Sequence, residues 1–361
     1  MLRIDQMTIL VTGGGGFLGR YIVRKLLAHG ARVHVYGRAE HQDLMSLGAK
    51  CYRGDICDYD TLTEAFSGVD TVFHTAGLVG IWGARSEYFR VNSAGTANVI
   101  RGCIENKVSR LIFTSTPGVI YGKGHASICE GDESIPYPTR YDAPYPASKA
   151  VAEKMVLASN GWEMVVRKPQ DEITPGDPVD TTIRRLSTCA LRPHLLWGPG
   201  DRNIMPRLIN RARHGKLRRI GDGRNLAHFC YVENAANAHL AAAMRLTPES
   251  ELAGKAIFVA DDDPVNLWQW IGDVLELSGL PPVKSAMSHQ MARRIGAAME
   301  VSHRLLPFLG EPLMTRLLAD MLAGTHTFDL SRARRLLDYE PEVDMQTGLQ
   351  NLAAWIKSEL L

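Results

Sequence analysis

Short apolar runs alternate with longer amphipathic stretches through the first half of the chain. The apolar runs have the length of buried strands, and the stretches between them repeat apolar positions with the spacing of a helix. The predicted strands are residues 8–11, 32–36, 49–53, 71–74, 110–114 and 189–193. The predicted helices are residues 17–29, 59–66, 86–106 and 144–159. This alternation predicts an α/β fold with a doubly wound parallel sheet that helices cover on both faces.

Three stretches interrupt the pattern. Residues 161–187 are polar and contain several prolines, which predicts a surface loop or a small irregular insertion. Residues 196–232 mix glycine, proline and basic residues. Residues 280–325 are rich in methionine, leucine and arginine at helical spacing. The second half of the chain is therefore expected to differ in organisation from the first.

The amino-acid composition disfavours only a few classes of protein. A formal net charge of +2 and 22% charged residues are ordinary for a globular protein and give no electrostatic case for nucleic-acid binding. The six cysteines show no Cys-x-x-Cys spacing, so neither a metal site nor a disulfide framework is predicted. The sequence shows no signal peptide and no apolar run long enough to span a membrane. Reduced thiols in the cytoplasm fit these observations best.

A glycine-rich turn lies between the first predicted strand and the first predicted helix. Gly13, Gly16 and Gly19 have the Gly-x-x-Gly-x-x-Gly spacing, with Phe17 and Leu18 inside the motif. Small residues allow a tight turn and let backbone N–H groups approach a pyrophosphate at the positive end of the helix. We therefore predict that these five residues bind a dinucleotide.

The end of the second predicted strand bears on which dinucleotide is bound. An acidic residue there accepts hydrogen bonds from a ribose hydroxyl and repels a phosphate. Gly37 stands at that position and Arg38 follows, and a guanidinium can pair bidentately with a 2′-phosphate. NADP(H) is therefore favoured, and NAD(H) with Arg38 as a solvated surface residue is the alternative.

Further cofactor contacts are expected at the carboxyl edge of the sheet. Asp55 and Ile56 could bracket an adenine after the third strand, although an exposed turn aspartate explains Asp55 nearly as well. Thr75, Ala76 and Gly77 follow the fourth strand, where ligands bind in folds of this class. These features predict a Rossmann-like dinucleotide-binding domain over residues 1–195, with the insertion at about 161–187. Residues 196–361 would then be mainly a smaller substrate-binding or lid region, with some segments returning to the core.

A candidate proton donor lies on the helix predicted over residues 144–159. Tyr145 and Lys149 are four residues apart and share one helix face, although this spacing is also common on solvated helices. Beside a cofactor site, the pair predicts carbonyl reduction or alcohol oxidation. Thr116, after the fifth strand, would orient the carbonyl, with Ser115 as the alternative. Tyr145 would donate the proton, and Lys149 would hold ribose hydroxyls and lower the pKa of the phenol.

Together these motifs resemble the extended short-chain dehydrogenase/reductases over residues of about 8–345, except for 161–187. The shared runs are the glycine turn, His74-Thr75-Ala76-Gly77, Val91-Asn92-Ser93-Ala94-Gly95-Thr96, Thr114-Ser115-Thr116, Tyr145-x-x-x-Lys149, Leu191-Arg192-Pro193 and Trp197-Gly198-Pro199-Gly200-Asp201. The resemblance implies that Thr116 is the catalytic hydroxyl and that Asn92 is structural. It also implies that the segment at Pro193 lies against the nicotinamide carboxamide.

Within that family the chain looks most similar to the 3β-hydroxysteroid dehydrogenase branch. The runs that carry this likeness are Gly80-Ile81-Trp82-Gly83, Thr114-Ser115-Thr116-Pro117, Ala143-Pro144-Tyr145 and Leu191-Arg192-Pro193-His194. The resemblance implies an oxidoreductase for a large apolar substrate. A 2-alkyl-3-oxoalkanoate, a β-keto acid of the lipid metabolism that leads to bacterial olefins, is the leading candidate. A sterol or steroid 3β-alcohol and a nucleotide sugar are the alternatives, and an inactive cofactor-binding regulator is the alternative outside enzymes.

The resemblance also implies a homodimer formed by the helices at 86–106 and 144–159, and assembly with other enzymes of the same pathway is a further expectation. Residues 286–322 leave three interpretations open. They could form amphipathic helices packed on the core, or a flexible apolar lid, since methionine-rich surfaces adapt to irregular ligands. The third interpretation is peripheral docking to a membrane, with arginines at the headgroups.

Overall fold

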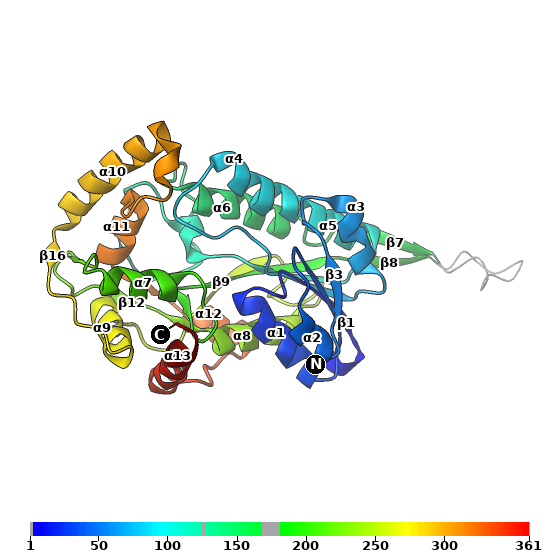
Figure 1. Ribbon diagram of the computed structural model, residues 1–361. Helices are drawn as coiled ribbons and strands as arrows, with labels where there is room; N and C mark the ends of the chain where they lie inside the picture. The colour runs from blue at the N-terminus through cyan, green and yellow to red at the C-terminus, as the bar shows by residue number, and fades with distance from the viewer. Residues whose placement is uncertain (1–2, 125–126, 168–180, 361) are drawn as a thin grey trace, which may run out of the picture.

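The computed structural model describes residues 3–124, 127–167 and 181–360. Its centre is a seven-stranded parallel sheet with the strand order β14-β9-β5-β4-β1-β2-β3 (Figure 1). The strands are β1 (Thr8–Thr12), β2 (Arg32–Gly37), β3 (Lys50–Arg53), β4 (Thr71–His74), β5 (Arg110–Thr114), β9 (Ser187–Pro193) and β14 (Lys255–Val259). The order reverses between β1 and β4, and ligands bind at the carboxyl ends of strands at such a point. The predicted doubly wound fold is confirmed.

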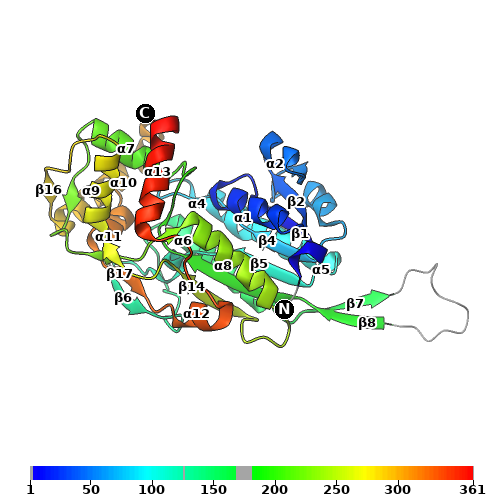
Figure 2. The same ribbon diagram turned by 90° about the horizontal axis from the view of Figure 1, so that it is seen from below.

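Helices cover both faces of the sheet because the central strands are buried on both sides. One face carries α1 (Phe17–Ala28), α8 (Val232–Arg245) and α12 (Ser331–Leu337), which share one apolar core with β1 and β2 (Figure 2). The other face carries α3 (Tyr59–Thr63), α5 (Gly95–Glu105) and α6 (Pro144–Ala158) over a second core. The short elements are η1 (Ile4–Gln6), α2 (Gln42–Ser46), η2 (Glu64–Phe66) and η4 (Pro117–Ile120).

The helix predicted over residues 86–106 has an irregular first half. It consists of α4 (Arg85–Tyr88), the π-helical segment η3 (Phe89–Ala94) and α5. Asn92 lies in the π-helical segment, where its side chain accepts a hydrogen bond from the N–H of Leu78 (2.7 Å) and donates to the carbonyl of Leu78 (3.0 Å). These bonds tie the loop that follows β4 to the helix, which gives the irregular segment a structural purpose.

The expectation of an irregular loop at 161–187 is wrong for its described parts. Residues on either side of the excursion pair as an antiparallel ribbon of β7 (Glu163–Arg167) and β8 (Thr181–Arg185), which projects from the body of the molecule (Figures 1 and 2). Both segments contain β-branched residues, which favour strands. The prolines predicted to form the loop lie outside the described residues.

The second half of the chain builds a smaller lobe beside the carboxyl edge of the sheet. Its helices are α7 (Ile204–Arg213), α9 (Leu267–Leu277), α10 (His289–Leu305), η6 (Pro307–Leu309), α11 (Arg316–Ala323) and α13 (Met345–Glu359). Its short strands are β6 (Ile128–Gly131), β10 (Leu196–Trp197), β11 (Arg219–Ile220), β12 (Leu226–Ala227), β13 (Cys230–Tyr231), β15 (Val265–Asn266), β16 (Ala286–Met287) and β17 (His326–Phe328). The chain returns to the large sheet through α8 and β14.

The apolar segment at 286–322 folds as α10, η6 and α11, but its apolar side chains have different surroundings. Ala319 of α11 is fully buried, whereas Leu305 and Phe308 are 76% and 81% exposed. The core-packing interpretation therefore describes α11 and is wrong for the turn that joins it to α10. Within the described residues, no helix is both long enough and apolar enough to cross a membrane.

Candidate active site

The glycine turn has a geometry that only glycine allows at its key positions. Gly13 has a φ of 73° and donates its N–H to the carbonyl of Tyr36 at 2.8 Å. A Cβ atom on Gly13 would lie 2.7 Å from the backbone nitrogen of Ala76. A Cβ on Gly19 would lie 2.7 Å from Gly14 Cα, inside the turn. The turn therefore brings backbone N–H groups to the start of α1, as a pyrophosphate site requires.

Side chains from outside the motif pack against this turn, and the sequence alone did not reveal them. Arg20 donates from Nε to the carbonyl of Gly15 (3.0 Å), pairs with Asp43 and contacts His41 Nδ1 at 3.2 Å. His41 covers Gly15 so closely that a Cβ on that glycine would overlap its ring. Burial and the Arg20 charge lower the pKa of His41, so the ring is neutral near pH 7. No local pattern linked His41 to the turn, because the contact is made only in the fold.

The residues predicted to contact the adenosine differ in how accessible they are to a ligand. Arg38 is exposed directly after β2 ends. Asp55 accepts a hydrogen bond from the N–H of Cys57 (2.9 Å) and lies 3.6 Å from Arg90, so it braces its own loop. Ile56 is only 6% exposed and belongs to the core beneath α5. The structure therefore leaves Arg38 open to a ligand and places Ile56 mostly inside the protein.

The residues after β4 lie between the glycine turn and the candidate catalytic helix. The Thr75 hydroxyl donates to the carbonyl of Thr12 (2.8 Å), and Ala76 lies against Gly13. A Cβ on Gly77 would be 4.0 Å from Lys149 Nζ. Pro193 ends β9 at the same edge of the sheet. These predicted cofactor residues thus surround one continuous region.

The candidate catalytic residues also meet at this edge. α6 begins at Pro144, so Tyr145 and Lys149 lie on its first turns. Tyr145 is partly buried, and the hydroxyl side chain of Thr116 lies near enough to its phenol to act on the phenol pKa. Ser115, the alternative, is only 4% exposed. The geometry therefore favours Thr116 over Ser115 as the partner of the phenol.

The expected lowering of the Tyr145 pKa is not seen in the chain itself. Burial raises the pKa of Tyr145 to about 12, against the opposing effect of the nearby Thr116 hydroxyl. Burial likewise lowers the pKa of Lys149 to about 7, although the charge of Glu153 acts in the other direction. Removal from water disfavours the charged form of each group. The phenol is therefore fully protonated near neutral pH, and Lys149 titrates there.

A buried ion pair fixes α6 against the sheet. Glu153, one turn beyond Lys149, accepts two hydrogen bonds from Arg192 of β9, at 2.6 and 3.0 Å. The two side chains are 0% and 3% exposed. Ser148 adds a contact of 3.0 Å with Asn92. Because the helix is held at several points, Tyr145 and Lys149 have fixed positions relative to β5 and β9.

An apolar cavity of about 290 Å³, called the substrate cavity below, opens beside Tyr145. Its walls come from the loop after β4, from α7, α9 and α11, and from the segment after β9. Most lining side chains are apolar or aromatic, including Trp197, Phe229, Trp270, Leu318 and Met321. The sequence could not reveal this set, because its members are far apart along the chain.

Polar groups occupy a few places on the same walls. Arg207 and Arg211 reach the substrate cavity from α7, and His194 reaches it from the end of β9. His194 Nδ1 hydrogen-bonds the carbonyl of His228 (2.6 Å), and burial lowers the pKa of His194, so its ring is neutral. Its Nε2 is then an acceptor without a partner among the described residues. A few polar groups in an apolar cavity are typical of a small-molecule site.

Fold and site together define an NAD(P)-dependent oxidoreductase of the extended short-chain dehydrogenase/reductase class that acts on CH–OH groups. The chain belongs to the 3-beta hydroxysteroid dehydrogenase/isomerase family, whose model matches residues 10–288. The resemblance inferred from the motifs is thereby confirmed.

Individual proteins are similar to this chain over nearly its whole length. The chain is 39% identical to the 2-alkyl-3-oxoalkanoate reductase of Stenotrophomonas maltophilia, over 96% of this chain and 99% of that protein. It is 31% identical to the human sterol-4-alpha-carboxylate 3-dehydrogenase, decarboxylating, over 94% of this chain and 88% of that protein. A solved UDP-glucuronic acid 4-epimerase of Bacillus cereus, in complex with NAD, matches with a TM-score of 0.69 at 22% identity, over 98% of this chain and 99% of that one. The last likeness is one of fold.

Proposed function

We propose that the chain is an NADP(H)-dependent ketoreductase that converts a 2-alkyl-3-oxoalkanoate to the corresponding 3-hydroxy acid. The observation that carries the proposal is the position of Tyr145, which lines a mostly apolar cavity close to the hydroxyl of Thr116. The relatives at 39% identity have this activity in their names. In this proposal the glycine turn binds the pyrophosphate of the dinucleotide through its backbone N–H groups.

The chemistry assigned to this chain is proton delivery and positioning. When bound, the dinucleotide supplies a hydride to the ketone carbon. The Thr116 hydroxyl and the Tyr145 phenol hydrogen-bond the ketone oxygen, and the phenol transfers its proton to that oxygen as the C–O double bond becomes single. A phenol with a pKa of about 12 is loaded with a proton at neutral pH, which suits the reductive direction. Lys149, 5% exposed, can hold ribose hydroxyls through its remaining donors.

Arg211 is our candidate for the carboxylate of the substrate. Arg207, one turn earlier, is engaged with Glu311 at 2.9 Å. The partly buried Arg211 guanidinium forms no hydrogen bond or ion pair with a described residue, although it lines the apolar substrate cavity. A desolvated guanidinium is stabilised by a carboxylate, which it can bind bidentately. The names of both relatives place a carboxylate on the carbon next to the reacting one.

That shared chemistry also makes a sterol carboxylate the second candidate. The aromatic wall favours it, since Phe229 and Trp270 both line the cavity and pack together with ring centroids 4.4 Å apart at an interplanar angle of 31°. A nucleotide sugar fits less well, because most of the wall is apolar. For the cofactor, exposed Arg38 at the end of β2 supports NADP(H) over NAD(H).

The test is consumption of NADPH and NADH by the purified chain with 2-alkyl-3-oxo acids, 3-oxosteroids, 4-carboxysterols and UDP-sugars. We expect turnover of NADPH with the oxo acids, and loss of turnover with retained dinucleotide binding in Tyr145→Phe. Turnover confined to steroids or sugars would overturn the substrate. Unchanged turnover in Tyr145→Phe would overturn the mechanism.

A further inference from the structure

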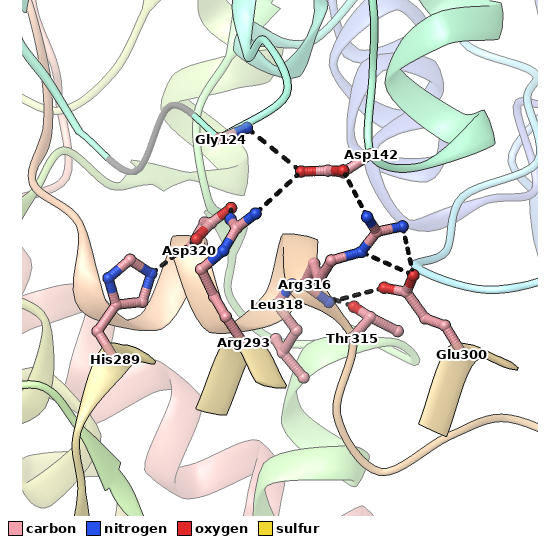
Figure 3. A network of polar contacts seen from close by, with 9 residues as sticks. All are labelled: Gly124, Asp142, His289, Arg293, Glu300, Thr315, Arg316, Leu318 and Asp320. Carbon is pink, nitrogen blue, oxygen red and sulfur yellow. Dashed lines mark hydrogen bonds and ion pairs between the residues drawn. The ribbon is translucent and has the colours of Figure 1, made fainter. Parts of the chain in front are cut away.

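Asp142 connects the start of the catalytic helix α6 to α10 and α11, which are called the lid helices below because α11 forms part of the wall of the substrate cavity. It precedes α6 directly and lies three residues before Tyr145. Its carboxylate is 5% exposed and faces two guanidinium groups, Arg293 of α10 at 3.6 Å and Arg316 of α11 at 3.4 Å (Figure 3). It also accepts a hydrogen bond from the N–H of Gly124 at 3.3 Å. One buried carboxylate thus contacts both lid helices and the loop that precedes β6.

The two arginines are anchored on the lid side as well. Arg316 forms a 2.7 Å ion pair with Glu300 of α10, and its backbone N–H donates to the same carboxylate at 2.8 Å. Arg293 pairs with Asp320 of α11, which His289 also contacts at 2.7 Å (Figure 3). α10 and α11 are therefore bound to each other, and Asp142 supplies the ion contacts between this unit and the catalytic domain.

Close backbone packing makes the two lid helices a single unit. A Cβ atom on Gly296 of α10 would lie 2.7 Å from the carbonyl carbon of Thr315, the residue that caps α11. Neither helix can shift along the other without breaking this contact. A change at Asp142 is therefore transmitted to α11 as a whole.

The opposite face of α11 forms part of the substrate cavity. Leu317, Leu318 and Met321 all line it. Leu317 also borders a second cavity of about 320 Å³, which lies in the seam between the lid and the catalytic domain and which Asp142 lines too. Because this seam contains open volume, apolar packing holds α11 less firmly there than in a filled core. The contacts across the seam are then the ion contacts of Asp142 and the packing of the Trp82 ring against His303 and Arg304 of α10.

We propose that Asp142 is a positioning residue that sets the distance of the α11 wall from Tyr145 and thereby the length of alkyl chain that the substrate cavity accepts. This inference rests on the proposed function for its substrates. Neutralising Asp142 removes the attraction between its carboxylate and the guanidinium groups of Arg293 and Arg316, which weakens the contact between the lid helices and the catalytic domain. α6 stays in place, because the Glu153–Arg192 pair holds it independently.

The test compares Asp142→Asn with wild type on a series of 2-alkyl-3-oxo acids of increasing chain length, with 3-oxobutanoate as the shortest. We expect KM for the longest acids to change by about fivefold or more. We expect kcat on 3-oxobutanoate and dinucleotide affinity to stay at wild-type values. Glu251→Gln, which removes an exposed pair with Arg335, is the control and should change none of these values.

Hydrogen exchange provides a readout that needs no substrate. Amides of α11 should exchange faster in Asp142→Asn, whereas those of α6 should not. If Asp142→Asn does not fold, Arg293→Gln removes one of the two ties and should give the same pattern in weaker form. A uniform change of KM over all chain lengths, or unaltered exchange in α11, would overturn the inference. If wild type reduces none of the oxo acids, the proposed function fails and the exchange result still decides the role of Asp142.

Discussion

Lys149 donates a hydrogen bond of 2.6 Å from Nζ to the carbonyl oxygen of Thr114, the last residue of β5. The same nitrogen lies 3.9 Å from the centroid of the Phe113 ring. An ammonium group has three donors, so the bond to Thr114 aims the remaining ones without using them all. Lys149 is thereby fixed in direction by the sheet before any ligand binds.

The buried position of Lys149 predicts a pH dependence of ketone reduction. Burial lowers the pKa of Lys149 to about 7, so its positive charge is present below that pH and is lost above it. The Tyr145 phenol, with a pKa of about 12, stays protonated through this range. We expect kcat/KM for reduction to fall as the pH rises through about 7, measured with saturating dinucleotide.

Lys149→Arg is the matched variant for this pH profile, because a guanidinium remains charged at all accessible pH values. Its absolute rate should be lower, since the side chain is larger and the site is buried. The decline above neutral pH should be absent from its profile. A wild-type profile that stays flat through neutral pH would contradict the role given to the Lys149 charge.

Tyr145→Phe should lower kcat by roughly 10²- to 10⁴-fold, the usual contribution of a well-placed general acid. Dinucleotide affinity, measured by fluorescence titration, should change little. Tyr88→Phe is the control, because its ring packs edge-on against Tyr145 with centroids 6.3 Å apart while its hydroxyl binds the carbonyl of Trp82. Equal losses in the two variants would indicate a packing effect in place of proton transfer.

The sequence was sufficient for features that depend on residues close together in the chain. Alternating runs predicted the sheet and its helices, and the glycine turn and the Tyr145–Lys149 pair are local motifs whose spacing carries their meaning. By contrast, β7 and β8 were missed, because prolines and polar residues concealed two short β-branched segments that stabilise each other only as a pair.

Features that depend on contacts between distant residues were beyond the sequence. Apolar residues at helical spacing in the lid gave no means of telling Leu318, which lines the substrate cavity, from Leu305, which is 76% exposed. Arg207 and Arg211 were two basic residues among several, and only the fold shows that Glu311 engages the first and not the second. The raised pKa of Tyr145 is another such case, since burial outweighs the opposing effect of the Thr116 hydroxyl.

Arg38→Asp tests the cofactor preference. Arg38 is exposed at the end of β2, where a 2′-phosphate is expected, and a carboxylate there repels the phosphate and accepts hydrogen bonds from a ribose. The ratio of kcat/KM for NADPH to that for NADH should fall by about tenfold or more, which corresponds to roughly 1.4 kcal/mol. Arg53→Asp, an exposed change at the end of β3, is the control for added negative charge. An unchanged ratio in Arg38→Asp would remove Arg38 from the site.

Loss of the buried pair between Glu153 and Arg192 should destabilise the fold strongly. Glu153→Gln leaves the Arg192 charge buried without its anion, which costs about 3–5 kcal/mol in the free energy of unfolding. Glu251→Gln removes an exposed pair and should cost at most about 1 kcal/mol. Urea denaturation of both variants measures the difference, and similar midpoints would show that the buried pair does not hold α6.

Arg211→Met tests whether the Arg211 guanidinium binds the carboxylate of the substrate. A 2-alkyl-3-oxo acid and its methyl ester share the same ketone and chains and differ in charge. In wild type the acid should be preferred, and Arg211→Met should lower kcat/KM for the acid by about 10- to 100-fold, the range for a lost hydrogen-bonded charge pair. The ester should be reduced equally well by both proteins, because it offers no charge to the guanidinium.

The control for this variant comes from the same helix. Arg213 is exposed on α7 and donates to the carbonyl of Leu360 at 3.2 Å, outside the substrate cavity, so Arg213→Met should reduce the acid and the ester as wild type does. Equal losses on acid and ester in Arg211→Met would mean that the residue shapes the cavity and does not bind the carboxylate. A preference for the acid that survives in Arg211→Met would instead move the carboxylate to Arg207, the other arginine on the wall of the substrate cavity.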